Sequence, residues 1–223
     1  MDAAAWDERY ASTELVWGAP PNSTVVQHIH GLERAPELVA DPDGTVPELP
    51  RALDLACGEG RNALWLATHG WQVHAVDWSQ VAVDKGRTVA TRLSRSVRTR
   101  ITWECADLTD PAVLTGRYEL VLMVFLHLPP EERRALVRRA AEVLTPGGTL
   151  LVLGHDTTNI SDGYGGPRDP SILFTPDDIR ADLGPLSAQI RIAVAERVLR
   201  PTEERDAIDA LVVARKRENS PGD

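Results

Sequence analysis

The sequence predicts an α/β fold built on a doubly wound, mostly parallel sheet of seven strands with an antiparallel C-terminal strand. Short apolar runs alternate with helical stretches between residues 52 and 154. Strands linked by helices run parallel, with helices on both faces of the sheet. Two further apolar-polar segments, at 188–200 and 207–216, are joined by the short stretch PTEERD with no helix between them. A link this short requires the two strands to run antiparallel.

Each element has its own signal in the chain. Short apolar runs predict five strands before the final pair, at 52–56, 72–76, 100–105, 118–125 and 149–154. Helical stretches are expected at 62–69, 79–93 and 130–144, and within the N-terminal segment VVQHIHGL. A short helix is expected after Thr175, whose hydroxyl can cap it, with Pro176 at its first position.

Changes in composition divide the chain into three regions. Residues 1–50 are expected to form an N-terminal aromatic lid and a linker, because polar and aromatic residues mix up to residue 32 and Pro, Asp, Glu and Gly dominate from 33 to 50. Residues 51–217 are expected to form the main domain, and residues 218–223 a flexible tail. A chain of 223 residues is long enough for one sizeable core and too short for two well-formed α/β domains.

Composition and charge argue against several classes of partner. The formal net charge of −9 argues against a nucleic-acid partner. No apolar run approaches the roughly 18 residues that span a bilayer, and the N-terminus lacks the order of a signal peptide, so we expect a cytoplasmic protein without a membrane partner. The two cysteines, Cys57 and Cys105, have no metal-ligand spacing, and no metal site is expected. The chain is expected to be a monomer or a homodimer.

The most informative stretch is ALDLACGEGRN at residues 52–62. An apolar run meets an acid at Asp54 and then turns through Gly58 and Gly60 into a helical segment. Glycine lets the backbone turn sharply and approach a bound molecule closely. The following helix presents free N–H groups and the positive end of its dipole to the same place. This pattern is typical of a nucleotide pocket.

Two readings of this pocket compete. The pattern Gly58-x-Gly60-x-x-Ala63, with Asp77 further along, also satisfies the dinucleotide fingerprint, so an NAD-dependent oxidoreductase is one alternative. However, Asp54 would repel a pyrophosphate, whereas it would favour a ligand that carries an ammonium and a sulfonium. A non-catalytic cofactor-binding module is a further alternative.

The motif and the strand pattern together resemble the class I S-adenosylmethionine-dependent methyltransferases. That family has D/E-x-x-x-G-x-G at this position and a Rossmann-like sheet that ends in an antiparallel strand. The resemblance covers about 52–216 and implies that S-adenosyl-L-methionine is the cofactor. It implies that Asp77 holds the ribose, Trp78 faces the adenine and Asp107 lies near the adenine amino group. The full set of cofactor residues implied is Trp17, Asp54, Ala56, Gly58, Gly60, Arg61, Asn62, Asp77, Trp78, Ser79, Ala106, Asp107, Leu108 and Val124.

The opening WDERYASTELVWGAPPN resembles the small-molecule branch that includes tellurite-resistance and thiopurine methyltransferases. That resemblance implies an aromatic N-terminal segment that folds over the cofactor, with Trp6, Arg9 and Tyr10 as lid residues. Aromatic faces stabilise a nearby sulfonium and exclude water. The alternative is that these rings only hold the N-terminal arm against the domain.

The methyl acceptor is expected to be a small molecule with a soft nucleophile, such as a thiol, a sulfide, or a selenium or tellurium species. A soft anion needs no base, whereas a hydroxyl or a protonated amine does. His127 and His155, which follow predicted strands, are the candidate catalytic residues. A histidine at such a position can equally be a loop residue that bonds to the backbone. The long loop at 155–174 is expected to form the substrate-side wall, with Tyr164 and Arg168 as contact residues.

Overall fold

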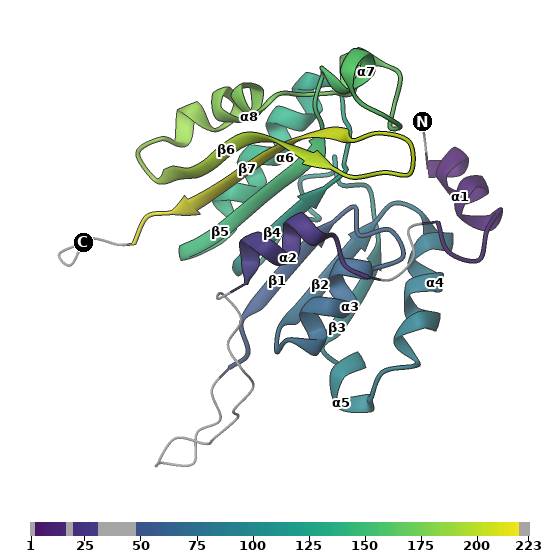
Figure 1. Cartoon of the computed structure of the whole chain (residues 1–223). Coiled ribbons are helices and arrows are strands. Elements are labelled where there is room, and N and C mark those ends of the chain that lie inside the picture. Colours follow the sequence, from purple (N-terminus) through teal and green to yellow (C-terminus); the bar gives the residue numbers. More distant parts are fainter. Residues whose placement is uncertain (1–2, 17–19, 31–47, 219–223) are drawn as a thin grey trace. The chain divides into compact units, whose positions relative to one another are not determined.

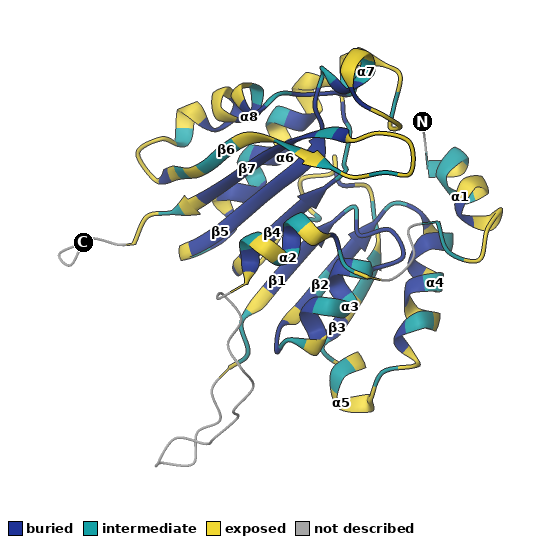
Figure 2. Ribbon diagram, in the orientation of Figure 1, coloured by how far each residue is buried: buried dark blue, intermediate teal, exposed yellow. Residues whose placement is uncertain are grey.

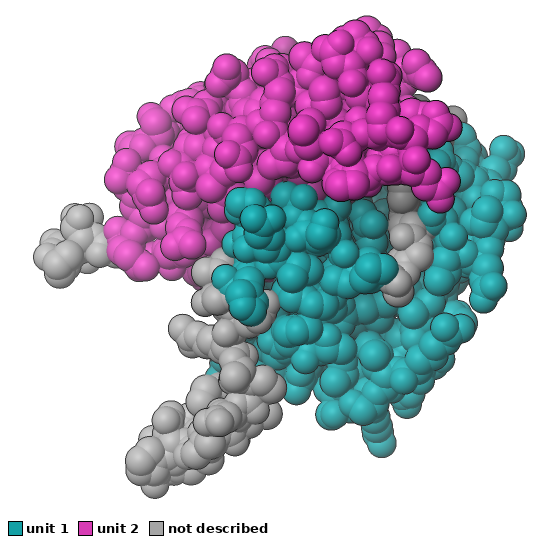
Figure 3. All heavy atoms as spheres, in the orientation of Figure 1, with its two compact units in different colours: residues 1–108 teal, residues 109–223 magenta. Residues whose placement is uncertain are grey.

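The computed structural model describes residues 3–16, 20–30 and 48–218. The chain divides into two compact units, residues 1–108 and residues 109–223, coloured teal and magenta in Figure 3. The two units are described separately below.

Unit 1 contains three parallel strands in the order β3-β2-β1. They are β1 (Arg51–Leu55), β2 (Gln72–Asp77) and β3 (Ile101–Cys105). The linking helices are α3 (Arg61–Thr68), α4 (Gln80–Ala90) and the short α5 (Arg95–Arg98) (Figure 1). In the register, Leu55 pairs with Val76 and Asp77 with Cys105. The carboxyl ends of β1, β2 and β3 therefore lie side by side, and the turn after each strand starts from the same edge.

Two helices precede the first strand. The helix α2 (Ser23–Ile29) was expected, and the Asn22 side chain accepts a hydrogen bond from the Val25 N–H at its start. The helix α1 (Ala3–Ala11) was not expected as a helix, because its aromatic and charged residues show no clear apolar face. Tyr10 is its one buried residue among those described.

Unit 2 contains four strands in the order β4-β5-β7-β6. They are β4 (Tyr118–Val124), β5 (Leu144–His155), β6 (Ile190–Arg200) and β7 (Ala207–Lys216). The helices are α6 (Pro130–Glu142), α7 (Asn159–Asp162) and α8 (Pro176–Leu183), and short 3₁₀ turns lie at Pro170–Ile172 and Gly184–Leu186. Thr175 caps α8 as expected, in a reciprocal capping box with Asp178.

The C-terminal strand pair confirms the predicted topology. β4 and β5 run parallel, and β7 runs antiparallel to both β5 and β6. β7 is inserted between β5 and β6, and most of its residues are buried, as Figure 2 shows in dark blue. Unit 1 thus has three parallel strands, and unit 2 has four strands of which one is antiparallel. This is the Rossmann-like α/β class that the sequence predicts.

Several element boundaries differ from the expectation, and two of them differ by three residues or more. The strand expected at 149–154 starts at Leu144, because a bulge carries the pairing with β4 across the glycines of the turn, from Tyr118–Leu144 to Leu120–Thr149. The helix expected to reach residue 93 ends at Ala90. Within the described residues, no helix has the length and apolar character needed to cross a membrane, and no cluster of metal-ligating side chains occurs among them.

Candidate functional site

The turn between β1 and α3 is built from residues in left-handed backbone conformations. Ala56, Gly58 and Gly60 have φ angles of 58°, 55° and 79°. A Cβ on Gly60 would lie 2.2 Å from the Trp103 ring, so a side chain cannot fit there. Ala56 is in the same region although it has a Cβ, a conformation that costs an ordinary residue roughly 1–2 kcal/mol. The turn therefore holds the backbone in a tight path that glycine favours.

Asp77 ties this turn to the next helix. Its Oδ2 accepts a hydrogen bond of 2.8 Å from the Gly58 N–H, and its Oδ1 accepts one of 2.9 Å from the Ser79 N–H. Burial raises the pKa of Asp77, while the bonds from Ser79 and Gly58 lower it. Its backbone oxygen also accepts from the Ala106 N–H at 2.9 Å. Asp77 thus connects the turns that follow β1, β2 and β3.

Asp54 is a buried acid without a full set of partners. Its side chain is 1% exposed, and Oδ2 has no hydrogen-bond partner within the part of the chain that the structure describes. Burial first, and then the charge of Asp77, raise its pKa to about 7, whereas Arg61 lowers it. A buried carboxylate oxygen without a partner is costly unless a ligand supplies one. A cationic ligand group fits this position, and the ammonium of S-adenosylmethionine is such a group.

The remaining predicted cofactor residues of unit 1 follow the ends of the three strands. Ser79 is buried, and its hydroxyl caps α4 by accepting from the Ala82 N–H at 3.1 Å. Asn62 is buried, and its Oδ1 accepts from the Asn22 N–H at 3.0 Å, so it holds the start of α2. Trp78 is half-buried, while Asp107 is exposed and Leu108 is buried. The structure thus brings the predicted residues of unit 1 to one strand edge, while their contacts with a cofactor remain predictions.

The N-terminal segment is attached to this edge by three charged side chains that the sequence did not single out, and two of them, Asp7 and Lys85, join α1 and the residues after it to α4. Asp7 accepts hydrogen bonds from the Ser79 hydroxyl and, at 3.3 Å, from the Val81 N–H at the start of α4. Lys85 donates to the carbonyls of Tyr10 and Thr13 and lies 3.7 Å from Glu59.

Glu59, in the turn after β1, is the third of these charged side chains and holds the N-terminal segment beyond α1. Its two carboxylate oxygens accept from the Val16 N–H at 2.9 and 3.1 Å. An acid inside the glycine turn was the one local signal that could have revealed this attachment.

Two of the predicted lid residues pack against each other on α1. The Trp6 and Tyr10 rings have centroids 5.6 Å apart, and the Arg9 guanidinium lies 5.3 Å from the Trp6 ring. Tyr10 is 4% exposed, so its ring is packed within unit 1, and its role in a lid stays a prediction. Trp17, the third aromatic residue of the N-terminal arm and a predicted cofactor residue, lies outside the described residues.

Unit 2 carries both candidate catalytic histidines at the carboxyl ends of its strands. The His155 N–H donates a 3.1 Å hydrogen bond to His127 Nε2, and the two rings stack with centroids 5.4 Å apart. Burial lowers the pKa of His127 to about 4, with a smaller contribution from His155. Val124 ends β4 nearby in sequence and is buried, and Phe125 after it has a positive φ of 57°.

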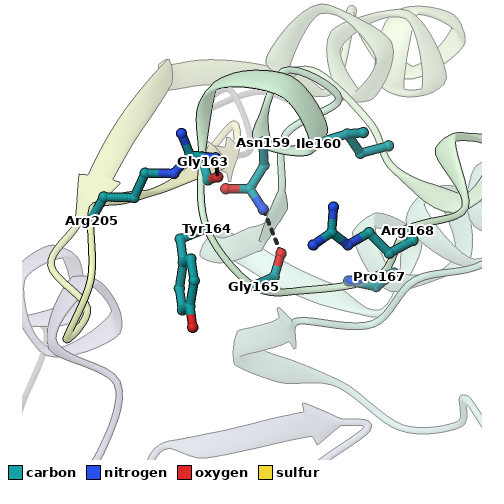
Figure 4. Close-up of a pocket in the computed structure, with 8 residues that line it drawn as sticks. All are labelled: Asn159, Ile160, Gly163, Tyr164, Gly165, Pro167, Arg168 and Arg205. Atoms are coloured by element: carbon teal, nitrogen blue, oxygen red, sulfur yellow. Dashed lines mark hydrogen bonds between the residues drawn. The ribbon is translucent and has the colours of Figure 1, made fainter.

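The loop after β5 surrounds a small hollow of about 40 Å³ (Figure 4). Asn159, which is buried, organises it by donating to the Gly165 carbonyl at 2.9 Å and accepting from the Ile208 N–H at 2.7 Å. Arg168 and Tyr164 both line the hollow, and the Tyr164 hydroxyl donates to Glu204 at 2.7 Å. The loop is therefore held by a contact within itself and by contacts with Glu204 and Ile208. The substrate role of Tyr164 and Arg168 stays a prediction.

A family model described as "Methyltransferase domain" matches residues 52–148. This match starts at β1 and includes Asp54, the glycine turn and Asp77. Residues 52–148 are a methyltransferase domain. S-adenosylmethionine is accordingly the cofactor of the methyltransferase domain, and Asp54 Oδ2 is a buried position that suits its positive charge.

Curated proteins match the chain over part of their length. Hemagglutinin 1 of Eikenella corrodens is 30% identical over 156 residues, which are 68% of this chain and 48% of that protein. The ribosomal RNA small subunit methyltransferase C of Alcanivorax borkumensis is 33% identical over 113 residues, 47% of this chain and 32% of that protein. The chain thus spans half the length or less of these relatives.

Solved structures share the fold of the methyltransferase domain. A structure described under "Conversion of a Disulfide Bond into a Thioacetal Group during Echinomycin Biosynthesis" has a TM-score of 0.69 at 20% identity, covering 98% of this chain and 93% of that one. TehB from Haemophilus influenzae has a TM-score of 0.66 at 16% identity, covering 91% and 64%. Magnesium protoporphyrin IX methyltransferase from Synechocystis PCC 6803, with bound SAH, has a TM-score of 0.64 at 21% identity, covering 96% and 95%. At these identities the likeness shows the fold alone.

Proposed function

We propose that the chain is an S-adenosylmethionine-dependent methyltransferase that acts on a small-molecule acceptor. The observation that carries this proposal is Asp54, a buried acid whose Oδ2 lacks a partner among the described residues, directly before the glycine turn of the methyltransferase domain. When bound, the cofactor supplies an electrophilic methyl group on a positively charged sulfur. The chain supplies charge complementarity, orientation and exclusion of water.

Each part of the edge formed by β1, β2 and β3 has a separate role in this proposal. Asp54 holds the cationic methionine end, and the turn backbone through Gly58 and Gly60 lies against it. Asp77, which already fixes the Gly58 and Ser79 amides, offers its remaining acceptor capacity to the ribose hydroxyls. Trp78 and Asp107 contact the adenine. The α1 residues Trp6, Arg9 and Tyr10, held by Asp7 and Lys85, close over the cofactor as a lid.

The acceptor is a small molecule with a nucleophilic thiol, sulfide, selenium or tellurium atom. Support comes from the resemblance of the N-terminal segment to the tellurite-resistance and thiopurine branch. Tyr164 and Arg168, on the loop after β5, contact this acceptor in the proposal. The net charge of −9 favours a small acceptor over nucleic acid. The name of one relative, a ribosomal RNA methyltransferase, makes RNA the competing class of acceptor to test.

Isothermal titration with S-adenosylmethionine and with S-adenosylhomocysteine tests the cofactor site. Wild-type protein should bind both, and Asp77→Ala should weaken binding at least about tenfold, because the turn and the ribose contact are lost together. The matched control is Asp84→Ala, since Asp84 is an exposed acid on α4 whose side chain pairs, among the described residues, with Gln80 and Arg87 of the same helix. Binding of NADH instead of S-adenosylmethionine would contradict the proposal.

A further inference from the structure

The last strand of unit 2, β6, has an open edge. In the order β4-β5-β7-β6, β7 pairs with one edge of β6, and no strand of residues 48–218 pairs with the other (Figure 1). β6 has 11 residues, which is long for a strand, and it contains neither the proline nor the lysine with which many proteins protect such an edge. Ala193, near its middle, is exposed. This open edge can therefore accept another strand.

Two opposite charges on β6 lack a partner within unit 2. The other two charged residues of the strand, Arg197 and Arg200, each form an ion pair with a buried aspartate. Arg191 and Glu196 are exposed, and neither side chain has a hydrogen bond or an ion pair within the part of the chain that the structure describes. A basic and an acidic side chain thus remain available on the strand whose edge is open.

A bulge in β6 brings these two charges to the same face of the sheet. Arg191 lies opposite Arg215 on β7, and Glu196 lies opposite Leu211. Arg215 and Leu211 are four residues apart, so their side chains point to one face, as do the side chains of the residues opposite them. In a regular strand, the five-residue spacing from Arg191 to Glu196 would put them on opposite faces. The register shift in the middle of β6 supplies the extra residue.

Val194 lies midway between the two charges on this face. It is half-buried, and its partner on β7 is Val213, halfway between the residues opposite the two charges. The face of β6 therefore reads basic, apolar, acidic at equal spacing. A pattern of this kind is complementary to itself when two copies run antiparallel. Val194 would then face the partner's Val194, and Arg191 would face the partner's Glu196.

The neighbouring strand adds a reason for an acid from outside the chain. Arg191 and Arg215 are exposed and directly opposite each other, and like charges in this position destabilise a sheet. The chain's own Glu196 is four positions along the strand, about 14 Å away, and cannot reach them. A carboxylate on an added strand, placed next to Arg191, would offset this repulsion.

We propose that β6 pairs antiparallel with β6 of a second copy of this chain, around a twofold axis at Val194. Two ion pairs, each between Arg191 of one protomer and the partner's Glu196, flank the axis, and main-chain hydrogen bonds join the strands. A single strand edge buries less surface than a tight dimer needs, so the dissociation constant is expected in the micromolar range. The pairing involves no cofactor and is independent of the proposed methyl transfer.

Sedimentation equilibrium of the full chain measures the association. Between about 1 and 300 µM protein at low salt, the average mass should rise from that of one chain toward that of two. A mass that stays at one chain throughout this range would overturn the proposal. A mass that continues to rise beyond two chains would also overturn it, because a twofold pairing closes after the second copy.

Exchanging the two charges tests the register. Glu196→Arg and Arg191→Glu each place like charges opposite each other at two positions, and each should weaken the association at least about tenfold. The double variant Arg191→Glu/Glu196→Arg restores two opposite pairs and should associate within about threefold of wild type. Its recovery would also exclude misfolding as the cause of the losses. A double variant that is as weak as the single variants would overturn the proposed pairing.

Glu203→Arg is the matched control for Glu196→Arg. Glu203 is an exposed acid between β6 and β7, and both substitutions reduce the net negative charge by two units. Lower net charge by itself favours association. Glu203→Arg should therefore not weaken the association, whereas Glu196→Arg should. Equal weakening by both would show that a contact at the open edge of β6 is not the cause, and would overturn the proposal.

A thiol cross-link locates the twofold axis. In a Cys105→Ser background, which removes the exposed native thiol, a short bis-maleimide should join Val194→Cys into a dimer. Val198→Cys is the control, because Val198 is half-buried on the same face of β6. In the proposed register, two copies of residue 198 are about 27 Å apart, beyond the reach of the reagent. Equal cross-linking at both positions, or none at Val194→Cys, would overturn the register.

Discussion

Burial gives the Asp54 carboxyl a raised pKa, so its ionisation is coupled to the binding of a charged ligand. Its pKa of about 7 places the charge change within the working pH range of most enzymes. The folded state without ligand favours the neutral acid, because burial and Asp77 both oppose the charge. A cationic ligand favours the ionised form. Binding of such a ligand must therefore release a proton when the pH is near or below 7.

S-adenosylmethionine should bind about tenfold more weakly at pH 6 than at pH 8, because only the ionised fraction of Asp54 is competent and that fraction falls about tenfold across this range. Titration calorimetry in two buffers of different ionisation enthalpy measures both the affinity and the proton release. Asp54→Asn controls for the amino group of the ligand, which titrates in a similar pH range. The same pH dependence in this variant would show that Asp54 is not the titrating group.

The same pKa predicts a change in stability without ligand. Because the folded state raises the pKa of Asp54, the folded state binds the proton more tightly than the unfolded chain. The contribution of Asp54 to stability is fully present below about pH 4 and is lost as the pH rises toward 7. Asp54→Asn should therefore be more stable than wild type at pH 8, with a smaller difference at pH 5. Urea unfolding at both values measures this, and a larger advantage at pH 5 would contradict it.

Sequence reasoning located Asp54 and Asp77 because a local motif places an acid, a turn and a second acid in order. It did not locate Asp7, Glu59 and Lys85, because each acts through a contact with a distant segment. Asp209 was missed for a related reason. Its contact with His155 depends on the register of β7 against β5, which sequence spacing does not determine. A single acid within the apolar run of β7 was the sequence feature that could have indicated this contact.

At the scale of elements, Trp103 on β3 is packed between the glycine turn and α4. A Cβ on Gly86 would lie 2.5 Å from the Trp103 ring, so α4 approaches β3 only because residue 86 is glycine. Gly86→Ala should destabilise the protein by about 1–3 kcal/mol through overpacking. Urea unfolding measures this difference in the free energy of unfolding.

Trp103→Leu removes the obstructing ring and supplies the control. In that background Gly86→Ala should cost less stability, because the ring is gone and the Glu59 carbonyl oxygen, 3.1 Å from the added Cβ, is the close contact that is left. An equal loss in both backgrounds would show that the ring is not the cause.

The attachment of α1 to α4 is a second element-scale prediction. Lys85→Met removes the bonds to the carbonyls of Tyr10 and Thr13, and bonds from a charged donor contribute about 1.5–3 kcal/mol. The Lys85 side chain is partly exposed, so the lower end of this energy range applies. Amide exchange across α1 should therefore become about tenfold faster. Hydrogen-exchange mass spectrometry measures it. Arg92→Met removes an exposed cation near the end of α4, and it should leave α1 unchanged; equal acceleration would contradict the anchoring role.

The elements were more predictable than their ends. The strands and the longer helices followed from apolar runs and helical spacing. The helix α1 did not, because contacts with α4 stabilise it, rather than an apolar face of its own. The early start of β5 was not predicted, because Pro146 and the following glycines indicate a turn. In the structure the pairing with β4 continues across these residues through a bulge.

At the scale of the whole molecule, the net charge of −9 separates the two classes of acceptor. Affinity for nucleic acid comes mainly from positive side chains that displace counterions from phosphates. The protein should show no salt-dependent binding to a ribosomal RNA fragment between 50 and 200 mM salt. Filter binding with labelled RNA measures this, and affinity that falls steeply with salt would favour the RNA class.

The position of β7 has a consequence for the synthesis of the chain. β5 and β6 do not pair with each other; each pairs with β7, which is translated after both. Until residue 207 and those after it leave the ribosome, β6 has no partner strand and one edge of β5 is open. An open strand edge is prone to pair with another chain. The carboxylate of Asp209, which faces His155, arrives with this last strand, so the strand pairing of unit 2 and this contact are completed in the same step.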